Sequence, residues 1–174
     1  GMLLPALAKA KSQAQKTNCI NNQKQLVLAV HMYTDDNDDY MPFPNWGVQT
    51  EGWAYKYSNR NIPKGESRFR PELGQLWTYV SNKDSFYCLA EKAEDLKSRR
   101  SQGLQDTTSY VMNGVVGKFP SGWVNNKTHK RNQFDSEDVL FWAPDERRIF
   151  NFNDASSTPG QIYFEGGQEI FSEG

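Results

Sequence analysis

The sequence predicts an α+β fold in which a long N-terminal helix packs on a small antiparallel β-sheet with long loops. Three observations lead there. No glycine or proline lies between Ala6 and Asp39, the second half of that stretch is amphipathic, and short apolar runs separated by Gly and Pro follow it. No repeat or composition shift divides residues 1–174, which we interpret as a single domain. Its helical spine spans residues 3–34 and its α+β head residues 35–174.

The predicted N-terminal helix has two unlike halves. It is rich in Ala, Lys, Gln and Leu, which are good helix formers, and Pro5 is tolerated in a first turn. In the back half, Leu26, Val30 and Tyr33 fall on one face and form the core stripe. The full stripe comprises Cys19, Gln23, Leu26, Val30 and Tyr33. The front half has only alanine as its apolar residue between Lys9 and Asn18, so those turns must project from the domain or pack on something else.

The remaining elements are expected to be short. The helix should end near Asp35–Asp39, whose side chains compete for backbone hydrogen bonds. A second helix is expected over Pro71–Val80, with Leu73 and Leu76 on one face. Residues 52–70 and the charged stretch that ends at Gln105 are interpreted as irregular. The strand candidates are Ser109–Asn113, Val139–Trp142, Ile149–Phe152 and Gln161–Phe164.

The stretch "LLPALAKAKSQAQKTNCINNQKQLVLAVHMYTDDNDDYMP" resembles a group of bacterial pilin-like proteins from planctomycete, verrucomicrobial and lentisphaeral bacteria. It is similar, more loosely, to the major pseudopilin of type II secretion systems. The matching residues are Leu3, Leu4, Pro5, Ala6, Leu7, Cys19, Asn21, Asn22, Lys24, Gln25, Leu26, Met32, Tyr33, Asp36, Asn37 and Pro42. Weaker matches are "GQLWTYVSNKDSFYCLA" and "SYVMNG". The chain departs from the pattern in having Cys88-Leu89 in place of Cys-Pro, and in lacking an "H…DG" segment between Gln161 and Gly174.

The resemblance implies a type IV pilin-like or pseudopilin subunit of a type II secretion-like or type IV pilus-like filament, which works by assembly in protein secretion. It implies a prepilin-type leader, removed by a peptidase, and about 20 apolar residues ahead of Leu3 that anchor the protein in a membrane. The expected location is the bacterial cell envelope, anchored in the inner membrane with the domain in the periplasm or at the cell surface. The expected partners are other pilin subunits and the secretion machinery.

A second function, from a different class, is suggested by the aromatic side chains. Trp46, Trp53 and Tyr57 lie in polar, loop-like sequence, where exposed rings could stack on a sugar or on a protein partner. This alternative is a membrane-anchored surface module that binds polysaccharide or protein. Rings that cap a thin core are the simpler interpretation of the same residues.

The best metal candidate is the sequence "DDNDD". Asp35, Asn37 and Asp39 have the first three ligand spacings of a calcium loop. The rest of that motif is missing, because Tyr40 takes the place of its glycine and Trp46 that of its bidentate glutamate. Calcium is therefore a possible ligand, and a solvated helix end is the alternative.

The two cysteines, Cys19 and Cys88, are too few for a structural zinc site. In an oxidising compartment they could form one disulfide, and otherwise they are two small buried side chains. We leave both interpretations open.

Catalysis and nucleic-acid binding find little support in the composition. The chain has 20 basic and 21 acidic residues and a net charge of −1, so no field of either sign steers a nucleic acid. Its two histidines, and the lack of any catalytic motif, lead us to expect no enzyme activity and no cofactor other than the possible calcium.

Overall fold

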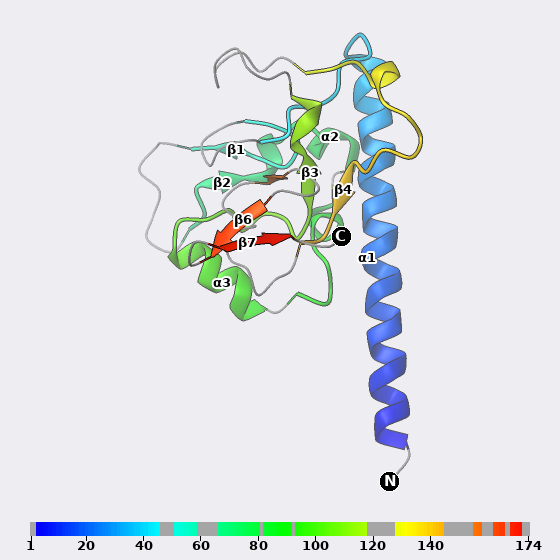
Figure 1. Ribbon diagram of the computed structural model, residues 1–174, viewed down its shortest axis with the longest axis vertical. Coiled ribbons are helices and arrows are strands. Elements are labelled where there is room, and N and C mark those ends of the chain that lie inside the picture. Colours follow the sequence, from blue (N-terminus) through cyan, green and yellow to red (C-terminus); the bar gives the residue numbers. More distant parts are fainter. Residues whose placement is uncertain are drawn as a thin grey trace.

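The computed structural model describes most of the chain. The described residues are 3–45, 51–58, 66–80, 82–91, 93–117, 128–144, 155–157, 162–165 and 168–171. A single long helix, α1 (Leu3–Asp36), runs along one side of a head made of short strands, short helices and loops (Figure 1). Its front half extends beyond the head. The predicted α+β, pilin-like arrangement is confirmed.

The helix α1 ends where the sequence predicts. Asp38 and Asp39 adopt left-handed backbone angles, with φ of 52° and 66°, which Asp and Asn tolerate better than most residues. The amide of Asp39 donates to the carbonyl of Thr34 at 2.9 Å, so a carbonyl of the last helical turn is satisfied. The acidic run therefore serves as the C-terminal stop of α1.

The strands form three small sheets, not the single antiparallel sheet that the sequence predicts. β1 pairs with β2 and β6 with β7, both antiparallel, while β3 pairs antiparallel with β4 and parallel with β5. The strands are β1 (Lys56–Tyr57), β2 (Phe69–Arg70), β3 (Val111–Asn113), β4 (Phe141–Trp142), β5 (Ser156–Ser157), β6 (Ile162–Glu165) and β7 (Gln168–Phe171). Strands this short contribute few ladder hydrogen bonds, so the head must depend heavily on side-chain packing.

Three predicted strands are found at their expected places and are shorter than expected. Ser109–Asn113 contains β3, Val139–Trp142 contains β4, and Gln161–Phe164 overlaps β6. The fourth candidate, Ile149–Phe152, lies outside the described residues. β1 and β2 fall within residues 52–70, which the sequence interpretation treated as irregular.

The short helices differ more from expectation. The predicted helix over Pro71–Val80 is two separate turns, because Gly74 between them has an extended backbone, with φ of −70° and ψ of 151°. Gly74 also lies so close to Ala54 that a Cβ would be 2.7 Å from its backbone carbon. Leu76 is buried as predicted, whereas Leu73 is exposed. Helix α3 was not predicted. The helical elements after α1 are η1 (Pro71–Leu73), α2 (Trp77–Val80), η2 (Lys83–Phe86), α3 (Ala93–Ser101), η3 (Gly114–Val116) and η4 (Arg131–Gln133).

Trp53 lies at the centre of the head's core. Its ring stacks on Phe86, with centroids 6.0 Å apart, and lies 4.9 Å from the ring of Phe141. Its indole nitrogen donates to the carbonyl of Ala155 at 2.8 Å. The one polar group of this buried side chain therefore has a hydrogen-bond partner. The same cluster includes Leu26 of α1, so helix and head share one core.

Candidate functional site

The back half of α1 is the part that holds the head. Of the predicted core stripe, Leu26 and Val30 are fully buried, and Tyr33 is half-buried with its ring edge-on to Tyr79, centroids 6.0 Å apart. Gln23, also predicted in the stripe, is only half-buried. The buried residues of α1 are Cys19, Asn22, Leu26, Ala29, Val30 and Thr34.

The first three turns of α1 are exposed along their whole length. All residues from 3 to 14 are exposed, and the leucines there are among the most exposed large side chains of the described chain. Leu3 is 86%, Leu4 76% and Leu7 69% exposed. The first buried side chain of the helix is Cys19, so the change from exposed to packed helix falls at that residue.

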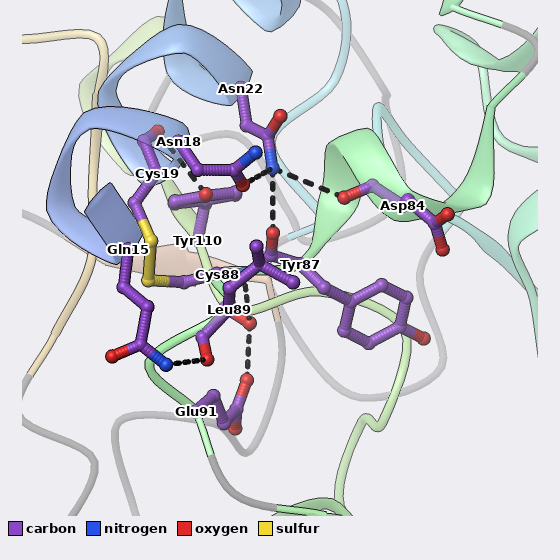
Figure 2. The surroundings of a disulfide bond; sticks show 11 residues. Gln15, Asn18, Cys19, Asn22, Asp84, Tyr87, Cys88, Leu89, Glu91 and Tyr110 are labelled. Carbon is purple, nitrogen blue, oxygen red and sulfur yellow. Dashed lines mark hydrogen bonds between the residues drawn. A yellow bond between two sulfur atoms is a disulfide. The ribbon is translucent and has the colours of Figure 1, made fainter. Parts of the chain in front are cut away.

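A disulfide joins the helix to the head at this boundary. Cys19 and Cys88 are bonded to each other, with their Cα atoms 4.8 Å apart (Figure 2). This is the first of the two interpretations that the sequence left open. One turn earlier, the side chain of Gln15 donates to the carbonyl of Leu89 at 3.0 Å. The bond therefore fixes α1 on the segment that follows η2.

Asn22, three residues after Cys19 on the same helix face, holds the same segment by hydrogen bonds. Its side-chain nitrogen donates to the carbonyl of Tyr87 at 2.7 Å and to that of Asp84 at 3.2 Å (Figure 2). The two carbonyls flank the last turn before Cys88. The side-chain amide of Asn22 thus supplies a hydrogen-bond donor to two backbone carbonyls of the head that face α1.

Tyr110, the residue immediately before β3, also contacts the helix at the disulfide. The hydroxyl of Tyr110 donates to the carbonyl of Cys19 at 3.3 Å. Burial raises the pKa of the Tyr110 phenol to about 12, while its interaction with Asn22 lowers it by a smaller amount. The phenol is therefore neutral, as a donor, over the whole physiological range.

Polar groups hold Cys88 from the head side. The amide of Cys88 donates to the Oγ of Ser109 at 2.9 Å, and that hydroxyl donates to the carboxylate of Glu91. Glu91 in turn pairs with Arg99 of α3, and both side chains are at least 98% buried. Arg99 also donates to the carbonyl of Thr108 at 3.1 Å. A buried ion pair with further hydrogen bonds of this kind makes the removal of either partner costly.

An arginine of the same chain pairs with two of the aspartates at the acidic end of α1. Arg131 lies 2.8 Å from a carboxylate oxygen of Asp35 and 2.9 Å from one of Asp39. Asn37 donates its side-chain nitrogen to the carbonyl of Tyr33 at 2.8 Å. Within the described residues, no three His, Cys, Asp or Glu side chains gather as a metal site. The calcium hypothesis for this segment stays a prediction, in which Ca²⁺ would compete with a guanidinium.

Two of the three aromatic residues proposed to bind a ligand lie within the described residues, and neither is freely exposed. The prediction that Trp53 offers an exposed ring is wrong, because the side chain is fully buried in the core. Tyr57 is half-buried and packs edge-on to Phe69, with centroids 5.4 Å apart. Trp46 lies outside the described residues. The continuous apolar run at Trp53-Ala54-Tyr55, all buried, was the signal in the sequence that pointed to a core segment.

Comparison with protein families gives a match over the N-terminal part of the chain. Residues 8–80 match the model of a family described as SBP_bac_10, Protein of unknown function (DUF1559). The match spans α1 from Ala8 and the head as far as α2, and it agrees with pilin-like proteins in general. Neither the curated proteins nor the solved structures contain a significant match. Among the described helices, none has the length and apolar character of a membrane span.

Proposed function

We propose that this protein is a pseudopilin-like structural subunit of a type II secretion-like or type IV pilus-like filament, which acts by assembly in protein secretion. The observation that carries the proposal is the front half of α1, whose residues 3–14 are helical and yet exposed on every side. At 1.5 Å per residue they form a rod about 18 Å long. The family match and the pilin-like fold support the same interpretation.

The exposed front half of α1 should be more stable when it packs against a partner than when it is alone in water. Isolated helices of this length are marginal in water, because helical stability in proteins comes mainly from packing. Leu3, Leu4 and Leu7 expose apolar area that burial against neighbouring helices would remove from water. The alanines that follow allow a neighbouring backbone to approach closely. Packing against equivalent helices of other subunits, or of the secretion machinery, meets both needs.

The proposal includes a location and a mode of action. A membrane anchor preceding Leu3 would place the head in the bacterial periplasm or at the cell surface, held in the inner membrane. The disulfide between Cys19 and Cys88 supports this placement, since disulfides persist in oxidising compartments. In this account the protein works without catalysis, and its prepilin-type leader and methylation belong to its maturation.

The test compares two leucine-to-aspartate variants of the full-length protein in a bacterium that assembles it. Leu7→Asp puts a charge on the front half of α1. Leu73→Asp puts the same charge on an exposed position of the head, 57% exposed in η1. We expect Leu7→Asp to abolish recovery in sheared or cross-linked filaments and to reduce secretion, and Leu73→Asp to leave both near wild-type levels.

The melting temperatures of the two variants, measured on the soluble domain, complete the test. Both positions are exposed, so neither change should alter stability appreciably. Normal assembly of a Leu7→Asp protein present at wild-type amounts would contradict the proposed function.

A further inference from the structure

The Cys19–Cys88 disulfide occupies one particular place on the helix–head interface. It lies at the first buried residue of α1, immediately after the long exposed front half. All other buried residues of the helix, from Asn22 to Thr34, come after it. A disturbance that enters through the front half therefore reaches this bond before it reaches the apolar contacts.

The order of these contacts matters because movement of the exposed helix end is transmitted along α1 to the interface with the head. Fraying of residues 3–14, or a sideways pull on them, loads the contacts one after another, starting with the nearest. Non-covalent contacts in such an arrangement open in sequence, each with the small cost of a single step. Only the hydrogen bond of Gln15 to Leu89 comes earlier, and the covalent bond at Cys19 stops the sequence there, because fraying from the front end cannot pass to Leu26 and Val30 while the bond is intact.

The surroundings of the bond suit it to this task. On the helix side, Asn22 donates to the carbonyls of Asp84 and Tyr87, so α1 and the segment before Cys88 are held at two points one helical turn apart. On the head side, the Cys88 amide is bound to Ser109. The hydroxyl of Ser109 donates in turn to Glu91, which forms a buried ion pair with Arg99. Figure 2 shows Cys88 and Glu91 on this side of the disulfide. A force on the disulfide is thus passed to a part of the head that is held by buried polar contacts.

We propose that the Cys19–Cys88 disulfide, with Asn22, is a clasp that prevents α1 from peeling away from the head when its front half is disturbed. The proposal goes beyond the filament function and does not depend on it, because it rests on the position of the bond in the folded domain. It assigns the bond a role in the native state. A cross-link that acted only by restricting the unfolded chain would stabilise every part of the domain equally.

Hydrogen exchange of backbone amides separates these two roles. The experiment compares the wild-type domain with the double variant Cys19→Ser/Cys88→Ser, which leaves no free thiol. The reference amides are those of Met112 and Asn113 in β3, which donate to the carbonyls of Ala155 and Leu140. The clasp predicts that amides 20–26 lose about tenfold more protection than the β3 amides do. An equal loss in helix and strand would overturn the proposal.

A second variant keeps the proposal testable should the double variant fail to fold. Leu26→Ala retains the disulfide and weakens the contacts that lie beyond it. With the clasp intact, amides 20–26 should remain protected in step with the β3 amides, because the helix can leave only when the domain unfolds. Selective loss of protection in amides 20–26 of the Leu26→Ala protein would contradict the clasp.

Discussion

Leu7 and Leu26 are the same residue type on the same helix, and they have opposite surroundings. Leu7 is 69% exposed on the front half of α1, whereas Leu26 is fully buried against the head. Both halves are helical because both consist of good helix formers. Helix propensity therefore explains why both halves of α1 are helical, but not why one half packs on the head and the other is exposed. The role of each half follows from what covers it, and the boundary falls at the disulfide.

The largest effect is expected from one substitution made in both halves. Leu26→Ala removes a fully buried side chain, and we expect the free energy of unfolding to fall by about 3 kcal/mol through lost burial and a cavity. Leu7→Ala is the matched control and should change it by less than about 0.5 kcal/mol. Urea denaturation of the two variants measures both values. Equal effects at the two positions would remove the distinction between the halves.

A neighbouring pair of asparagines sharpens the comparison within the back half. Asn22→Ala removes the donor to the carbonyl of Tyr87 and leaves that of Asp84 with only the Tyr87 amide, and we expect a loss of about 1–2 kcal/mol. Asn21→Ala changes an exposed residue on the adjacent face of α1 and should have little effect. Denaturant midpoints at fixed m-value give the difference. Similar midpoints for the two variants would show that the hydrogen bonds of Asn22 contribute nothing.

A pH titration tests the contact between Tyr110 and the carbonyl of Cys19 without altering the helix. Burial raises the folded-state pKa of Tyr110 from its ordinary value of 10 to about 12. The folded state therefore favours the neutral phenol, and this contribution is complete below pH 10 and lost as the pH rises toward 12. We expect the unfolding free energy to fall over that interval, and Tyr110→Phe to show a smaller decline. An identical decline in wild type and variant would assign it to other groups, among them Tyr87, whose pKa burial also raises.

The smallest effect is expected at the acidic end of α1. Arg131 already pairs with Asp35 and Asp39 and would have to be displaced by a cation, so millimolar Ca²⁺ should leave the melting temperature of the wild-type domain unchanged relative to chelator. Arg131→Ala is the informative variant, because it frees both carboxylates for a cation. A stabilisation of the wild-type domain by Ca²⁺ that Mg²⁺ does not reproduce would instead favour the calcium hypothesis.

The parts of the fold that the sequence predicts well are those with one dominant signal. The length of α1 follows from an unbroken run of helix formers, and its end near Asp36 from the acidic residues that follow. The stripe through Leu26 and Val30 follows from helical periodicity. The predicted stripe contains Gln23 and not Asn22, because helical periodicity does not show which polar side chain finds partners in the head. The partners of Asn22 lie more than 60 residues away in sequence.

The parts that the sequence predicts poorly are stabilised by polar burial or by distant backbone approach. Helix α3 lies in a charged stretch that resembles a solvated loop, yet its Arg99 is buried against Glu91. Trp53 was expected in an exposed loop, and it is buried because Phe86, Phe141 and Ala155 converge on it. No local pattern predicts such contacts, since each depends on the tertiary arrangement of segments that are far apart in the chain.

The division of α1 at Cys19 is tested most directly by the hydrogen-exchange profile of the wild-type helix. The account predicts fast exchange, near the rate of an unstructured peptide, for amides 6–14, whose residues are exposed. It predicts slow exchange, near that of the β3 amides, for amides 22–34. The change should occur within about one helical turn of Cys19. Uniform protection along the helix, or a change far from Cys19, would contradict the account.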